Sequence, residues 1–87
     1  MQIRFNRQFS KQYDKAPEKI RKSFKKKLKI FTLDKRSAIL NNHALKGKFR
    51  GFRSINVTGD WRALYKEYRS KDLVIFVALG THSQLYR

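Results

Sequence analysis

The chain of 87 residues is predicted to fold as a single α+β domain, in which an N-terminal helical hairpin packs on one face of a small antiparallel sheet. Apolar residues recur at helical spacing in the first part, whereas the second half contains segments of strand character separated by tight turns. With 40% hydrophobic and 14% aromatic residues, the chain can close one core but has no room for a second. We therefore expect one domain over residues 1–87.

A short strand and a first helix open the chain. Residues 2–5 alternate polar and apolar side chains, which is typical of a strand. Asn6 can then cap a helix over residues 7–15. The apolar side chains of this helix form one stripe: Phe9, Tyr13 and Ala16.

Pro17 interrupts the first helix and suits the first turn of a second, since the missing N–H costs no hydrogen bond there. An apolar stripe predicts that second helix: Ile20, Phe24, Leu28 and Phe31. Lysines cover its other side: Lys22, Lys25, Lys26 and Lys29. Such a run of charge is typical of a solvated helix face and, in a chain this basic, is equally compatible with a nucleic-acid contact.

The second half predicts a sheet. Residues 32–44 are less regular and are expected to form a loop with a short helical turn at 36–40. Three strands are predicted after it: residues 52–58, 61–69 and 72–79. The tight-turn sequences at 58–60 and 69–71 predict an antiparallel meander. The expected order is β-α-α-β-β-β, with the first strand at an edge, the helices on one face and the other face open to a ligand.

The net charge of the chain limits the classes of partner that it is expected to bind. Twenty-two Lys and Arg against six acids give a formal charge of +16, which attracts polyanions, and nucleic acid is the favoured one. An acidic protein partner is also compatible. A membrane is disfavoured, because no apolar segment is long enough to span one. Without cysteine, and with two histidines and six scattered acids, no metal site and no cofactor are expected. The first residues lack a signal-peptide core, so we expect a cytoplasmic protein.

Residues 80–87 follow an apolar run over 73–79 that predicts a buried strand. His82 would therefore be held rigidly, and an imidazole can transfer protons near neutral pH. Tyr86 offers a ring for stacking on a base. Taken alone, a histidine that caps a strand and a tyrosine that packs the terminus are the simpler interpretation.

Three blocks together favour a functional interpretation: residues 43–55 (HALKGKFRGFRSI), 59–65 (GDWRALY) and 79–86 (LGTHSQLY). In order and spacing they resemble the RelE/ParE toxin superfamily, most closely its YafQ-type branch. The resemblance is specific over the second half of the chain and generic over the helical hairpin. It implies a RelE-like fold, ribosome-dependent cleavage of messenger RNA that inhibits translation, and neutralisation by a cognate antitoxin.

The resemblance also implies roles for individual residues. Metal-free RNA cleavage needs a base for the 2′-hydroxyl, cations for the phosphate and an acid for the leaving oxygen. His82 is the candidate acid, Asp60 or His43 the base or the group that orients it, and Tyr86 the stacking ring. The candidates for phosphate contact are Lys46, Lys48, Arg53 and Arg62. Of these, Arg62 is also counted among the catalytic residues.

Simpler structural roles stay open for some of these residues. Asp60 could simply cap a turn, and residues 46–48 could form an ordinary turn without a functional role. Where YafQ-type enzymes commonly carry a histidine, this chain has Asn56, which cannot exchange a proton at neutral pH. The alternative function is that of a ParE-like toxin, which inhibits DNA gyrase without cutting RNA.

Overall fold

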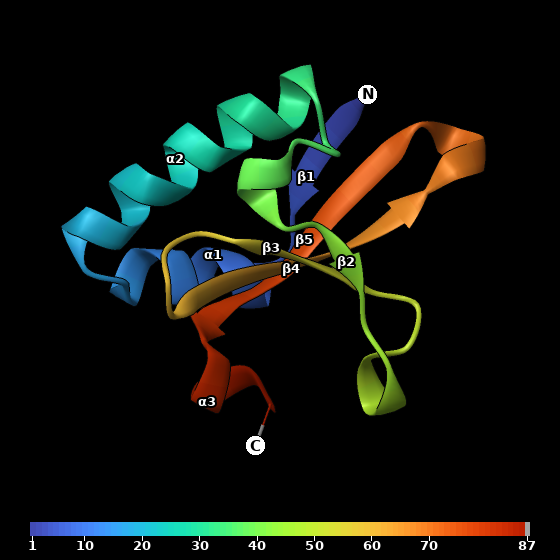
Figure 1. Ribbon diagram of the computed structural model, residues 1–87. Coiled ribbons are helices and arrows are strands. Elements are labelled where there is room, and N and C mark those ends of the chain that lie inside the picture. Colours follow the sequence, from blue (N-terminus) through green and yellow to red (C-terminus); the bar gives the residue numbers. More distant parts are fainter. Residues whose placement is uncertain (87) are drawn as a thin grey trace.

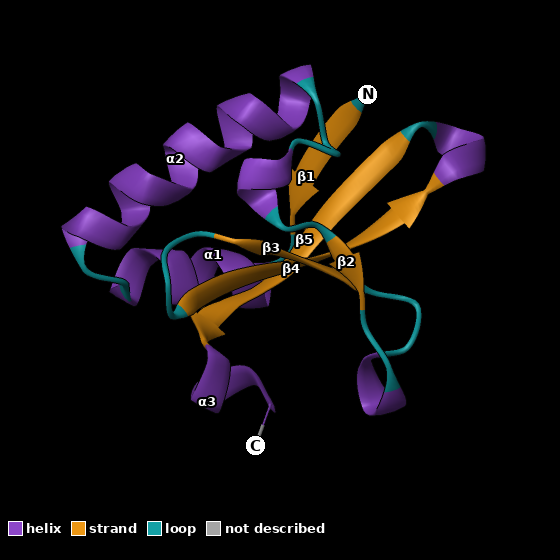
Figure 2. Ribbon diagram, viewed as in Figure 1, coloured by secondary structure: helices purple, strands orange, loops and turns teal. Residues whose placement is uncertain are grey.

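The computed structural model describes residues 1–86 and confirms the α+β class (Figures 1 and 2). One five-stranded sheet has the order β1-β5-β4-β3-β2. The strands are β1 (Gln2–Phe5), β2 (His43–Ala44), β3 (Arg53–Asn56), β4 (Trp61–Tyr68) and β5 (Leu73–Thr81). The helices are α1 (Arg7–Lys15), α2 (Glu18–Leu33) and α3 (His82–Tyr86), and the 3-10 turns are η1 (Ala38–Leu40), η2 (Gly47–Phe49) and η3 (Arg69–Lys71).

The sheet differs from the prediction at both edges. The meander β3–β4–β5 is antiparallel as expected, but β1 pairs with β5 in parallel, so the sheet is mixed. Tight turns impose antiparallel pairing on the meander, whereas no turn joins β1 to β5 and none sets its direction. The two-residue strand β2, which was not predicted, pairs with β3 at the other edge. A segment this short carries too little pattern to be recognised.

The helical hairpin covers one face of the sheet, which we call the helix face. Phe76 of β5 lies at its centre and is fully buried. Five aromatic rings surround Phe76 with centroids 5.4–5.8 Å away: Phe5, Phe9, Phe24, Phe31 and Tyr65. The apolar stripes predicted from helical spacing are thus the surfaces that α1 and α2 bury.

The opposite face of the sheet was predicted to be open, and that expectation is wrong at one end. Leu64, Ala78 and Leu85 form a second buried cluster there, with Leu45 and Phe49 packed against it. In Figure 1, α3 and the η2 segment both lie on the side of the sheet away from α2. We call this surface the α3 face.

A capping box explains why α3 forms. The Thr81 backbone N–H donates to Gln84 Oε1 (2.9 Å), and the Gln84 backbone N–H donates to Thr81 Oγ1 (3.2 Å). Thr-x-x-Gln is the sequence signature of this arrangement, which satisfies two N–H groups that a helix start would otherwise leave unpaired. The sequence therefore contained a signal for α3.

Asn6 caps α1 as predicted, and its replacement should have a measurable cost. Asn6 Oδ1 accepts a hydrogen bond from the Phe9 backbone N–H at 2.8 Å. Asn6→Ala is expected to lower the free energy of unfolding by about 1 kcal/mol, whereas Asn6→Asp keeps an acceptor oxygen and should cost less. Urea denaturation of both variants measures the difference. Equal stability of Asn6→Ala and the unaltered chain would contradict the role of this cap.

No helix within residues 1–86 combines the length and the apolar character needed to cross a membrane.

Candidate active site

A cavity of about 380 Å³ on the α3 face brings together five of the eight residues predicted from the sequence. They are His43, Lys46, Arg62, His82 and Tyr86, and Asn41 and Leu45 complete the lining. No Asp or Glu belongs to the lining residues, so the charges at the cavity are cationic. A site with two imidazoles, an ammonium and a guanidinium is suited to a phosphate ester.

His82 is the first residue of α3, and its side chain is exposed. The backbone holds it from two directions, because its N–H donates to Asp60 O at 3.0 Å and the capping box fixes the turn around it. The rings of His82 and Tyr86 lie one helical turn apart, with centroids 4.7 Å from each other. The two predicted side chains therefore form one unit on the wall of the cavity.

His43 enters the cavity from β2, which is an edge strand of the sheet. Its side chain is exposed, and Nδ1 lies 2.8 Å from Asn41 O. A carbonyl oxygen only accepts, so Nδ1 carries the proton of this hydrogen bond. In the neutral ring, Nε2 is then left with a lone pair and can take a proton.

Arg62 reaches the cavity from β4, across from Asn56 on β3. Its Nη1 donates to three carbonyl oxygens, two in the turn between these strands and one at the start of β4: Thr58 O (3.0 Å), Gly59 O (3.1 Å) and Trp61 O (3.1 Å). A guanidinium has five N–H donors, of which Nη1 holds two. The donors on Nε and Nη2 have no partner within residues 1–86 and are available to an anion.

Arg53 lies on the helix face, away from the cavity. Successive side chains of a strand point to opposite faces. In the β3–β4 pairing Arg53 is opposite Tyr65, a residue of the helix-face core, whereas Arg62 is opposite Asn56. Arg53 Nε donates to Asn42 Oδ1 at 2.8 Å. The structure thus separates the two arginines that were grouped in the sequence.

Asp60 and Lys48 border the region without lining the cavity. The Asp60 side chain is exposed, and it is the backbone oxygen of this residue that contacts His82. The turn is closed by a different residue, since Thr58 Oγ1 accepts from the Trp61 backbone N–H. Lys48 lies on η2 with its ammonium 5.3 Å from the Phe49 ring centroid.

Three further polar residues lie near the site, of which sequence reasoning singled out Asn56 but missed Asn41 and Ser54. Asn41 adopts a left-handed conformation (φ 46°), which Asn tolerates better than most residues. Ser54 and Asn56 point to the α3 face from β3, and Ser54 Oγ and Asn56 Oδ1 are buried without a hydrogen-bond partner in the described part of the chain. Asn56 therefore lies under the site, across from Arg62 on the neighbouring strand.

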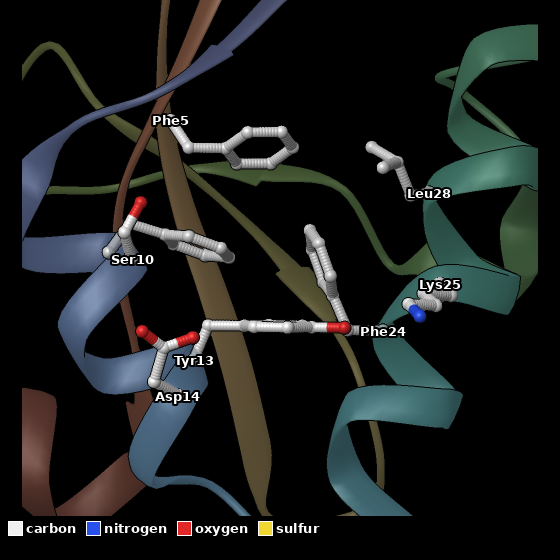
Figure 3. Close-up of a pocket in the computed structure, with 8 residues that line it drawn as sticks. Phe5, Ser10, Tyr13, Asp14, Phe24, Lys25 and Leu28 are labelled. Carbon is white, nitrogen blue, oxygen red and sulfur yellow. The ribbon is translucent and has the colours of Figure 1, made fainter.

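A second cavity, of about 290 Å³, lies between β1, α1 and α2 (Figure 3). The close-up shows the rings of Phe5, Tyr13 and Phe24 around it, with Asp14 and Lys25 at its rim. It contains no histidine and no pair of cations, so it lacks the groups for acid–base chemistry on a phosphate. Within residues 1–86, no three His, Cys, Asp or Glu side chains are grouped so that they could hold a metal ion.

Solved toxin structures share this fold. The crystal structure of YafQ from E. coli BL21(DE3) is 25% identical, with a TM-score of 0.81, and the match covers 98% of this chain and 97% of that one. YafQ in the E. coli DinJ–YafQ toxin–antitoxin complex is 26% identical, with a TM-score of 0.79 and coverage of 98% and 96%. A YoeB/ParE toxin from Agrobacterium tumefaciens, at 14% identity, shares the fold (TM-score 0.78, coverage 94% and 99%). No curated protein sequence matches the chain.

The family match and the fold, which is shared with solved YafQ and YoeB/ParE toxins, identify a toxin of the RelE/ParE superfamily, of the type found in type II toxin–antitoxin systems. The family model described as "Bacterial toxin of type II toxin-antitoxin system, YafQ" matches residues 1–87. Because this match spans the whole chain, the chain belongs to the YafQ toxin family.

Proposed function

We propose that this toxin is an endoribonuclease that cleaves messenger RNA on the ribosome and so inhibits translation. The observation that carries the proposal is the single cavity lined by His43, His82, Arg62 and Lys46, with the Tyr86 ring beside them. A protein that acted only by binding would have no need for two imidazoles beside a cationic pair. Membership of the YafQ family supports the same function.

In the proposed mechanism, His43 Nε2 takes the proton of a ribose 2′-hydroxyl. The 2′-oxygen attacks the adjacent phosphorus, a bond forms between them, and the bond from phosphorus to the 5′-oxygen breaks. His82 donates a proton to that leaving oxygen. Arg62 and Lys46 stabilise the charge that develops on the phosphate oxygens, and Tyr86 stacks on a neighbouring base. Each step uses a side chain that lines the cavity.

The partners follow from the same proposal. The related E. coli toxin forms a complex with its antitoxin DinJ, and we propose that this chain is likewise neutralised by a cognate antitoxin. A charge of +16 favours an acidic partner and also favours approach to ribosomal RNA and messenger RNA.

Primer extension on a messenger RNA, with and without translating ribosomes, tests the function. We expect new transcript ends within the coding region only when ribosomes translate it. Inhibition of gyrase supercoiling by the purified chain, with intact transcripts, would overturn the proposal in favour of the ParE-like alternative.

Arg62 and a lysine of α2 should respond differently to the same loss of charge. Arg62→Gln is expected to lower the cleavage rate by about 10²–10³-fold, as loss of a contact to the developing negative charge does. Lys26→Gln removes one charge from the exposed surface of α2 and should change the rate only about 2–3-fold, because it mainly steers association. Because Arg62 also holds the 58–61 turn, thermal denaturation accompanies the kinetics. Equal losses in the two variants would place the active surface elsewhere.

A further inference from the structure

A hydrogen-bonded cluster of Asn42, Arg53 and Tyr65 lies directly beside His43 but outside the cavity. We propose that Asn42 is a positioning residue for His43: held by Arg53 and Tyr65, it fixes the neighbouring Asn41 carbonyl so that His43 carries its proton on Nδ1. Its effect on cleavage rests on the proposed function, whereas the position of the proton does not.

The short strand that carries His43 needs such support. β2 has two residues, both exposed, and its ladder consists of the pairs His43–Ser54 and Ala44–Arg53 at the edge of the sheet. Edge segments of this length open easily. The preceding Asn41 is in the left-handed region, a conformation that persists only when the surrounding structure maintains it. The Leu45 backbone N–H donates to Phe52 O (3.0 Å) after the ladder, so it is the residues before His43 that depend on contacts of their own.

Asn42 supplies these contacts through both the oxygen and the nitrogen of its side-chain amide. Its Oδ1 accepts from Arg53 Nε (2.8 Å), and its Nδ2 donates to Tyr65 Oη (2.7 Å) and to Lys35 O (2.9 Å). An arginine only donates and a carbonyl only accepts, so the amide has one possible orientation. Both amide hydrogens and the amide oxygen are engaged, which fixes Asn42 in position and direction.

The groups that hold Asn42 are themselves tied to the core or to β4. Tyr65 is fully buried, with its ring 5.1 Å from Phe31 and 5.4 Å from Phe76, measured between centroids. Lys35 forms an ion pair with Glu67 of β4 at 2.5 Å. The cluster therefore connects the segment before His43 to the core on the helix face. This connection gives Arg53 a role on the side of the sheet opposite the cavity.

The position of the Asn41 carbonyl determines which ring nitrogen of His43 carries the proton. Asn41 O lies 2.8 Å from His43 Nδ1 and can only accept, so the hydrogen bond selects the Nδ1–H form of the neutral ring. In free histidine the neutral ring favours the Nε2–H form, which would present a donor where the mechanism needs an acceptor. By holding Asn41 in place, Asn42 keeps the lone pair of Nε2 available to the 2′-hydroxyl.

Nitrogen NMR of the full-length chain, at a pH where its imidazoles are neutral, tests the position of the proton. Correlations between ring nitrogens and carbon-bound ring protons distinguish a protonated from an unprotonated nitrogen. We expect a protonated Nδ1 in His43, and His82 serves as an internal reference because its ring makes no hydrogen bond within residues 1–86. A His43 ring protonated mainly on Nε2 would overturn the inference, whether or not the chain cleaves RNA.

Variants then test the role of Asn42. Asn42→Ala should shift His43 toward the Nε2–H form and lower kcat for ribosome-bound messenger RNA about tenfold or more, with KM changed less than about 3-fold. Tyr65→Phe keeps the core ring and removes one partner of Asn42, so it should produce a smaller shift in the same direction. Tyr68→Phe on the same strand is the matched control and should leave the tautomer and kcat unchanged. An unchanged tautomer in both Asn42→Ala and Tyr65→Phe would overturn the proposal.

Failure of the proposed function gives a different pattern. If the tautomer responds to the variants as expected but no form of the chain cleaves messenger RNA, the positioning of His43 is supported and the nuclease assignment is wrong.

Discussion

His82→Gln is expected to lower the rate of ribosome-bound messenger RNA cleavage by about 10²–10⁴-fold, the usual contribution of a general acid, and to abolish growth inhibition. Glutamine can form hydrogen bonds but cannot donate a proton to the leaving 5′-oxygen. The fold should survive, because the side chain is exposed and the contacts that build α3 here are made by the backbone of His82 and by Thr81 and Gln84. Quench-flow or primer-extension kinetics at matched protein levels measure the effect.

Ser83→Ala is the matched control for this variant. Ser83 is the next residue of α3, is also exposed and does not line the cavity. We expect it to keep the cleavage rate within about 3-fold of the unaltered chain, as for a surface position away from the chemistry. A His82→Gln chain that remained fully toxic would remove His82 from the mechanism, and a Ser83→Ala chain with the same defect would assign the loss to α3 as a whole.

The second large effect is expected from His43→Gln, with a loss of about 10²–10⁴-fold in cleavage rate, because the 2′-hydroxyl then has no base. Both histidines line one cavity, while the Asp60 side chain does not. Asp60→Asn should therefore reduce the rate by less than about tenfold, even though the sequence leaves Asp60 and His43 as equal candidates. The contrast between these two variants identifies the base.

Asn56→His adds an independent check on the same question. Asn56 lies on the α3 face opposite Arg62, and the sequence resemblance implies a histidine at this position in YafQ-type enzymes. With His43 as the base, the new imidazole should change the rate less than about 3-fold in the otherwise unaltered chain. If Asn56→His raised cleavage strongly, or if Asp60→Asn matched the loss in His43→Gln, the assignment of His43 would be wrong.

Local sequence signals predicted most of the secondary structure. The cap at Asn6, the two apolar stripes and the turns at 58–60 and 69–71 each act over a few residues, and the structure confirms the elements they predicted. Helix α3 had an equally local signal in Thr81 and Gln84, which the strand character of the preceding segment obscured. The direction of β1 and the existence of β2 depend on pairing between distant segments, so no local pattern could reveal them.

By itself, the sequence determined the α+β class, the strongly basic character of the surface and the set of side chains that could carry out acid–base chemistry. Only the tertiary structure decided which of them meet. Arg53 and Arg62 look equivalent in the sequence, yet the pairing of β3 with β4 sends Arg53 to the helix face and Arg62 to the cavity. The physical reason is the two-residue period of a strand: both faces of this sheet carry buried apolar clusters, so hydrophobicity along the strand cannot tell which side of the sheet will hold the site.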